Sequence, residues 1–274
     1  MKAAAALLGL LAALAAPGAP AKSATMLEGQ VGVDAISPET LCGIGRGRRC
    51  DINQAIALGL VETGLRPRFP EGAQCRDIDE QWAIDYTYKR RREAYHGGID
   101  MPAPFGTPII AAAAGTVVSL SASPDSYRGA EIILRHAPAD TGIDLWIYTQ
   151  YAHFGSGPDL AVGERVAMGQ VLGPTGNSGR RPKRARRQRR PAIHFAVWFS
   201  NDPGFALQRG KVIPVQGRWM DPNALYRNTP PFESGAMQAL PAPEKKVPIP
   251  VMFDAGGTHP AVTKLVWPYA CKRK

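Results

Sequence analysis

Four apolar runs from about Ile109 onward constrain the fold most strongly. They are PIIAAAAGTVVSLS, AEIILRH, LWIYTQYAHF and IHFAVWFS, and each is bounded by Gly, Pro, Asp or Ser. Runs of this length that are rich in β-branched and aromatic residues are typical of strands. Between the last two lies LAVGERVAMGQVLGPTGNSG, whose repeated glycines predict tight turns. The pattern therefore predicts a mainly β domain built on an antiparallel β-sheet or sandwich.

The two flanks of this β-rich part have a different composition. Residues 22–40 are small and polar, which indicates a linker. From Asp51, DINQAIALGLVETG has an acidic N-cap candidate and Gly64 as a stop, which predicts one short structural helix. From about Pro230, PP, PAP and PIP segments predict an extended tail. We expect a linker and small helical region over 22–85, the β domain over 86–229 and a Pro-rich C-terminal tail over 230–274.

The chain opens on MKAAAALLGLLAALAAPGAPA, where one lysine precedes an Ala/Leu run that ends on small residues. This is the pattern of a secretory signal peptide, and we expect residues 1–21 to be removed. The apolar run is too short to cross about 30 Å of hydrocarbon, and no later stretch reaches spanning length. We therefore expect an exported protein, periplasmic or extracellular, with no stable membrane span.

Export also favours disulfide bonds, and the chain has four cysteines. Of the possible connectivities we favour Cys42 with Cys50, which closes a short Gly/Arg loop. Cys75 with Cys271 would then tie the tail back to the rest of the chain.

The formal net charge is +10, and a basic run, RRPKRARRQRRP, covers residues 180–191. In an intracellular protein such a run would favour nucleic-acid binding. Behind an export signal it favours an anionic wall polymer, and we expect no nucleic-acid partner. A solvated loop without a dedicated partner is an equally good interpretation.

The histidines are the main candidates for chemistry. His96 opens HGGID, where two glycines permit a sharp backbone course that lets His96 and Asp100 converge. An imidazole and a carboxylate are suitable zinc ligands. In AIHFAV the side chains alternate, so His194 points away from the apolar face, towards the side of the small residues. His153 ends TQYAHF, where alternation places it on the same side as Tyr151.

Two further histidines carry weaker signals. His136 ends the run AEIILRH, and we expect a structural role at a strand end. His259 lies in the Gly-rich segment GGTHP and is expected at the surface. Tyr151 is expected to be a packed aromatic residue.

The order of HGGIDMPAPFGTPIIAAAAGTVV, QYAHF, VGERVAMGQVLGPTGNSG and IHFAV resembles the lysostaphin and LytM-like zinc metallopeptidases over roughly residues 90–200. These enzymes cut peptide bonds in peptidoglycan. The resemblance implies one zinc ion bound by His96, Asp100 and His194, matching the family's HxxxD pair and the last His of its HxH motif. It also implies that His153, in the YxH motif, is the catalytic histidine. The implied substrate is a cell-wall peptide.

The sequence departs from the family at Ala192, which stands where the first His of the HxH motif is usual. His153 alone could suffice, or Tyr151 or a nearby arginine could take over. An arginine could stabilise an oxyanion but could not act as a general base near neutral pH. Two functions follow: a zinc endopeptidase that hydrolyses peptidoglycan peptides, or a weakly cleaving or inactive module that binds wall peptide or regulates another wall hydrolase. The retained ligand set favours the enzyme.

Overall fold

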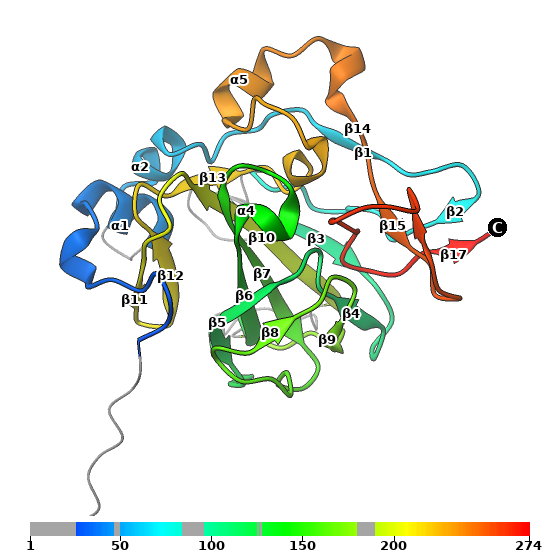
Figure 1. Ribbon diagram of the computed structural model, residues 1–274, viewed down its shortest axis with the longest axis horizontal. Coiled ribbons are helices and arrows are strands. Elements are labelled where there is room, and N and C mark those ends of the chain that lie inside the picture. Colours follow the sequence, from blue (N-terminus) through cyan, green and yellow to red (C-terminus); the bar gives the residue numbers. More distant parts are fainter. Residues whose placement is uncertain (1–25, 47–49, 84–95, 125, 127, 180–189) are drawn as a thin grey trace, which may run out of the picture.

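The computed structural model describes residues 26–46, 50–83, 96–124, 126, 128–179 and 190–274 (Figure 1). The expected signal peptide and most of the basic run, residues 180–189, lie outside the described residues. Within the described ranges, no helix combines the length and the apolar character needed to cross a membrane.

A seven-stranded antiparallel sheet forms the centre of the molecule (Figure 1). The strand order is β13-β10-β7-β6-β5-β8, and β3 pairs with the first half of β10, on the side that β13 occupies further along. Its strands are β3 (Ile99–Pro102), β5 (Gly115–Ser121), β6 (Ala130–His136), β7 (Trp146–Phe154), β8 (Arg165–Val166), β10 (Ala192–Ser200) and β13 (Arg218–Met220). The apolar runs predicted as strands supply β5, β6, β7 and β10, so the mainly β prediction is confirmed.

Short hairpins and bridges surround this sheet. β4 (Pro108–Ile110) pairs with β9 (Val171–Pro174), and β11 (Phe205–Gln208) pairs with β12 (Lys211–Pro214). A four-residue helix, α4 (Pro138–Thr141), follows β6. Every residue of β10 is buried, as is all of β7 after Trp146. Strands that are covered on both faces carry buried side chains on both, so apolar residues predominate in these two runs and are not confined to alternate positions.

The N-terminal region contains more helix than the sequence patterns predict. The expected helix is α2 (Ile52–Ala57), capped by the Asp51 side chain. A second helix, α1 (Pro38–Gly45), begins where a linker was expected and follows the short 3-10 turn η1 (Val33–Ala35). Ser37 caps α1, and the Trp219 indole donates to the Gly43 carbonyl oxygen at 3.0 Å. The two glycines of α1 weaken its intrinsic propensity, so packing against the sheet stabilises a helix that local rules miss.

The C-terminal residues form short elements that pack on the remainder of the protein (Figure 1). β14 (Lys246–Pro248) pairs with β1 (Arg66–Arg68), and β17 (Lys272–Arg273) pairs with β2 (Ala73–Gln74). The other elements are η2 (Ala224–Arg227), α5 (Ser234–Gln238), η3 (Ala242–Lys245), β15 (Val251–Met252) and β16 (Thr258–His259). Both expected disulfides, Cys42–Cys50 and Cys75–Cys271, are present.

His136, at the end of β6, is fully buried and hydrogen-bonded within the sheet. Its Nδ1 lies 2.5 Å from the Ala114 carbonyl oxygen and its Nε2 lies 2.7 Å from Thr149 Oγ1. Burial lowers the pKa of His136 from its ordinary value of 6.5 to about 4. The ring is therefore neutral at neutral pH, as a structural role requires.

This low pKa predicts an acid-sensitive contribution of His136 to stability. Between pH 6.5 and 4 the unfolded chain takes up a proton that the folded ring does not, so stability present above pH 6.5 is lost as the pH falls. We expect a loss of about 3 kcal/mol between pH 7 and pH 4 from this residue. Denaturant unfolding at both pH values should show a smaller pH dependence for His136→Gln than for wild type. The exposed His259→Gln is the control, and an unchanged pH dependence in His136→Gln would refute the assignment.

Candidate metal centre

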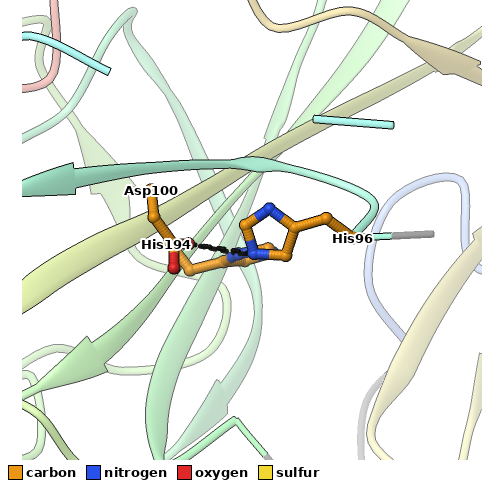
Figure 2. Close-up of side chains that lie close together, drawn as sticks. All are labelled: His96, Asp100 and His194. Carbon is orange, nitrogen blue, oxygen red and sulfur yellow. Dashed lines mark hydrogen bonds and ion pairs between the residues drawn. The ribbon is translucent and has the colours of Figure 1, made fainter. Parts of the chain in front are cut away.

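His96, Asp100 and His194 converge at the start of the pairing between β3 and β10 (Figure 2). Asp100 lies on β3 directly opposite His194 on β10. His194 Nδ1 is 3.0 Å from Asp100 Oδ1 and 3.1 Å from His96 Nε2, and His96 Nε2 is 3.1 Å from Asp100 Oδ1. All three side chains are buried. Three donor atoms from two strands and one turn thus share a single small space.

The two glycines of HGGID make this convergence sterically possible. A Cβ on Gly98 would lie 2.5 Å from His194 Cε1 and 2.8 Å from the Phe195 carbonyl oxygen. Gly97 has φ +75°, in the left-handed region that favours glycine, and a Cβ there would collide with the Arg46 guanidinium. Gly98 therefore gives the imidazole of His194 its place, and Gly97 allows the turn that brings His96 round.

Backbone groups of residues 79–82 hold this turn in position. The Trp82 carbonyl oxygen accepts from the Gly97 amide at 2.7 Å, and the Asp100 amide donates to the Glu80 carbonyl oxygen at 3.0 Å. The Gln81 carbonyl oxygen lies 3.2 Å from His96 Nδ1. A carbonyl oxygen only accepts, so Nδ1 carries the hydrogen and the lone pair of His96 is on Nε2, towards Asp100 and His194. From the other side, Arg46 donates to the His96 carbonyl oxygen at 3.0 Å.

The electrostatics of the three groups suit metal binding. Burial, followed by the nearby charge of Arg128, holds the pKa of His194 well below its ordinary value. Burial opposes ionisation of Asp100, but its interactions with His96 and His194 outweigh this effect, so its pKa lies well below the usual range. A neutral imidazole and an ionised carboxylate are the forms that bind a metal ion. Their separations of 3.0–3.1 Å approach the roughly 3.3 Å expected between tetrahedral ligands with bonds of about 2.0–2.1 Å.

His153 lies beside this cluster because β7 contains a bulge. Its ring centroid is 5.8 Å from that of His194. The pairing of β6 with β7 passes from Ala130–Phe154 to Glu131–Ala152, which leaves His153 as the additional residue, with φ +73°. The extra residue turns the side chain onto the face of His194. Its Nδ1 is 2.9 Å from the Ser178 carbonyl oxygen, which places the lone pair of the neutral ring on Nε2.

The expectation that Tyr151 and His153 share one side of the strand is wrong for this reason. The Tyr151 ring packs on Phe195 in the core with centroids 5.2 Å apart, on the face opposite to His194. Its hydroxyl accepts from the Ala112 amide at 2.8 Å. Burial raises the pKa of Tyr151 to about 12, so the residue is structural. Alternation fails because a bulge inserts one residue into the period of two.

An arginine that no sequence motif singled out also reaches the cluster. Arg128 Nη1 lies 2.5 Å from His194 Nε2, the ring nitrogen opposite the one that faces Asp100. Ala192 is buried on β10, two residues before His194, so it shares that residue's side of the strand and adds no polar group. The contacts that position the site join residues that are separated in the sequence, and local patterns do not encode them. These contacts involve Arg46, Gln81, Trp82 and Arg128.

Residues 94–213 match the model of Peptidase family M23. This segment belongs to peptidase family M23. The match covers the turn of His96, β3, β7 and β10, so the resemblance based on the HxxxD, YxH and HxH positions is confirmed at the level of the family. It places the domain among the peptidases.

Each alignment with an individual relative of the M23 domain covers only part of this chain, of the relative, or of both. Peptidoglycan DD-endopeptidase ShyA of Vibrio cholerae is 30% identical over 110 residues, which are 38% of this chain and 23% of ShyA. The chain therefore spans less than a quarter of that relative. A variant of the catalytic domain of the prophage-encoded M23 protein EnpA from Enterococcus faecalis is 23% identical, covering 55% of this chain and 94% of its own, with a TM-score of 0.34. A zinc-containing peptidase from Vibrio cholerae is 21% identical, covering 55% of this chain and 39% of its own, with a TM-score of 0.35.

Proposed function

We propose that this protein is an exported zinc-dependent endopeptidase that hydrolyses peptide bonds of peptidoglycan, with zinc bound by His96, Asp100 and His194. The observation that carries the proposal is the buried cluster of three donor atoms at 3.0–3.1 Å from one another. The hydrogen bond from His96 Nδ1 to the Gln81 carbonyl oxygen supports it, because metal-binding histidines use such a partner to fix their orientation. Membership of a peptidase family and similarity to a peptidoglycan endopeptidase support the substrate class.

The zinc ligands and His153 have different roles in the proposed hydrolysis. A zinc ion at this site would act as a Lewis acid that polarises the peptide carbonyl and makes water acidic, with a pKa of roughly 7. His153 takes a proton from the attacking water on Nε2, since its Nδ1 hydrogen is held by the Ser178 carbonyl oxygen. Water adds to the carbonyl carbon, the C–N bond breaks, and the proton passes from His153 to the leaving amine.

Ala192 favours a second candidate function, a module that binds wall peptide or regulates another wall hydrolase. Alanine at this position, two residues before His194 on β10, supplies no second histidine to assist in acid–base catalysis. An Ala192→His variant with a large gain of cleavage would support this interpretation. The intact ligand cluster favours the enzyme.

Zinc content and cleavage test the enzyme directly. We expect one zinc ion per wild-type chain and a near-complete loss in His194→Ala, because two remaining ligands bind zinc poorly. The exposed His259→Ala should retain zinc and serves as the matched control. With purified peptidoglycan, the wild-type protein should release new amino groups, and a chelator should stop the release. A zinc content equal to that of wild type in His194→Ala would exclude His194 as a ligand. Cleavage that continues in the presence of the chelator would refute zinc dependence.

A further inference from the structure

Arg128 is a charged side chain at the candidate centre for which hydrolysis by His153 provides no role. Its Nη1 contacts His194 at Nε2, whereas His194 Nδ1 faces His96 and Asp100. The guanidinium therefore lies on the Nε2 side of the imidazole ring, and the three ligand atoms lie on the Nδ1 side. A cation in that place would contact a substrate group that binds next to the metal.

The same bulge that orients His153 holds Arg128 in position. The Arg128 carbonyl oxygen accepts from the His153 amide at 3.2 Å. The next two residues pack on Ser178: a Cβ on Gly129 would collide with its hydroxyl, and the Ala130 amide donates to Ser178 Oγ at 3.0 Å. Ser178 also binds His153 through its carbonyl oxygen. Arg128 is thus anchored by its backbone to the residues that form the site.

A hydrogen bond from Arg128 to His194 Nε2 and metal binding through His194 Nδ1 require different tautomers of the imidazole. A guanidinium only donates, so the contact needs the lone pair of the imidazole on Nε2. A neutral ring that binds a metal ion through Nδ1 carries its hydrogen on Nε2 and cannot accept there. With a metal ion on Nδ1, the donors that Arg128 directs at Nε2 would therefore need another acceptor.

Lys211, on β12, is a second cation, and its charge interacts with that of Arg128. Its Nζ donates to the Gly45 carbonyl oxygen. Burial, then the charges of Arg128 and Arg46, lower the pKa of Lys211 to about 8, although Glu131 opposes the shift. The carboxylate of Glu131, which accepts from the Gln150 side chain, interacts with both cations and offsets part of their charge. With two cations against one carboxylate the site still suits an anionic group, and a planar guanidinium binds a carboxylate through two parallel hydrogen bonds.

We propose that Arg128, supported by Lys211, determines specificity by binding a free carboxylate of the substrate peptide next to the scissile bond. This inference rests on the proposed function. In an extended peptide successive residues are about 3.3 Å apart. A cation beyond the ring of His194 therefore meets a neighbouring residue of the substrate, not the reacting carbonyl. The preferred substrates are acidic wall peptides.

Chemical removal of the substrate charge tests the proposal. Soluble muropeptides are prepared from purified peptidoglycan with a muramidase, and in half of them the free carboxylates are converted to methylamides. For the zinc-loaded wild-type protein we expect amidation to raise KM about 10- to 100-fold, as for loss of a charged hydrogen bond. Arg128→Gln should bind the two substrates alike and keep its zinc. The control is Arg165→Gln, which changes an exposed arginine of β8 that pairs with Asp140 of α4. This variant should retain the full preference for the native substrate.

Equilibrium binding separates this proposal from the proposed function. The zinc-loaded His153→Ala protein should bind native muropeptides about 10- to 100-fold more tightly than amidated ones, whether or not the wild type cleaves them. A preference in binding without any cleavage by the wild type would refute the endopeptidase and retain the carboxylate site. Equal binding of both substrates overturns the carboxylate site. An equal fall in kcat for both substrates in Arg128→Gln also overturns it, and assigns Arg128 to the reacting carbonyl.

Discussion

Gly98→Ala will weaken zinc binding about 10- to 100-fold, even though it changes none of the three candidate ligands. The added Cβ would lie 2.5 Å from His194 Cε1, 2.6 Å from its Nε2 and 2.8 Å from the Phe195 carbonyl oxygen. The backbone of Gly98 is outside the left-handed region, so the effect arises from this collision and not from backbone strain. His194 must therefore shift from the position in which its Nδ1 faces Asp100. Competition with a chromophoric chelator measures the change in zinc affinity.

Gly235→Ala is the matched control for this prediction. A Cβ on Gly235 would meet no atom within 4 Å, and the residue lies in α5. Alanine there should leave zinc affinity unchanged and stabilise the protein slightly, by about 0.5–1 kcal/mol. Gly98→Ala should in addition lose about 1–3 kcal/mol of folding stability through overpacking. Wild-type zinc affinity in Gly98→Ala would show that His194 does not bind the metal from its present position.

The strands of the sheet could be predicted because their signals are local. The runs that became β6, β7 and β10 carry the composition of buried strands and end at residues that break strands. The face of His194 followed from alternation along β10, whose pairing is regular from Ala192 to Ser200. The candidate ligands were identified by family resemblance, and the register of Asp100 against His194 explains why HxxxD and the second His of HxH occur together.

The remainder of the site depends on interactions that local sequence does not specify. His153 faces the cluster only because of a bulge. One inserted residue moves its side chain to the side of the strand opposite to the one that alternation predicts. Gln81 contributes only through its backbone carbonyl oxygen, so the identity of its side chain carries no signal in the sequence. Arg128 reaches His194 across 66 residues of sequence. Such contacts form only when the entire sheet is assembled.

Removing the Cys75–Cys271 disulfide by Cys75→Ala with Cys271→Ala should destabilise the protein by about 5 kcal/mol. The disulfide joins residues 196 apart, and the entropy lost by the unfolded chain grows with the length of the closed loop. Next to it, the Trp267 indole donates to the Arg76 carbonyl oxygen at 3.0 Å, so the tail is attached just before residues 79–82. Those residues hold the turn of His96. We therefore expect zinc to be released at the same lowered temperature at which the fold is lost.

Cys42→Ala with Cys50→Ala provides the comparison, since that disulfide closes a loop between residues only 8 apart. The same loop-entropy relation gives a loss of about 2.5 kcal/mol. Denaturant unfolding under oxidising conditions should rank the three proteins as wild type, the Cys42/Cys50 variant and the Cys75/Cys271 variant, in order of decreasing stability. Thermal melting of the zinc-loaded proteins, followed with a zinc indicator, then tests the link to the site. If the Cys75/Cys271 variant matches wild type in stability, the tail does not fix residues 79–82, and the local hydrogen bonds alone hold His96 in place.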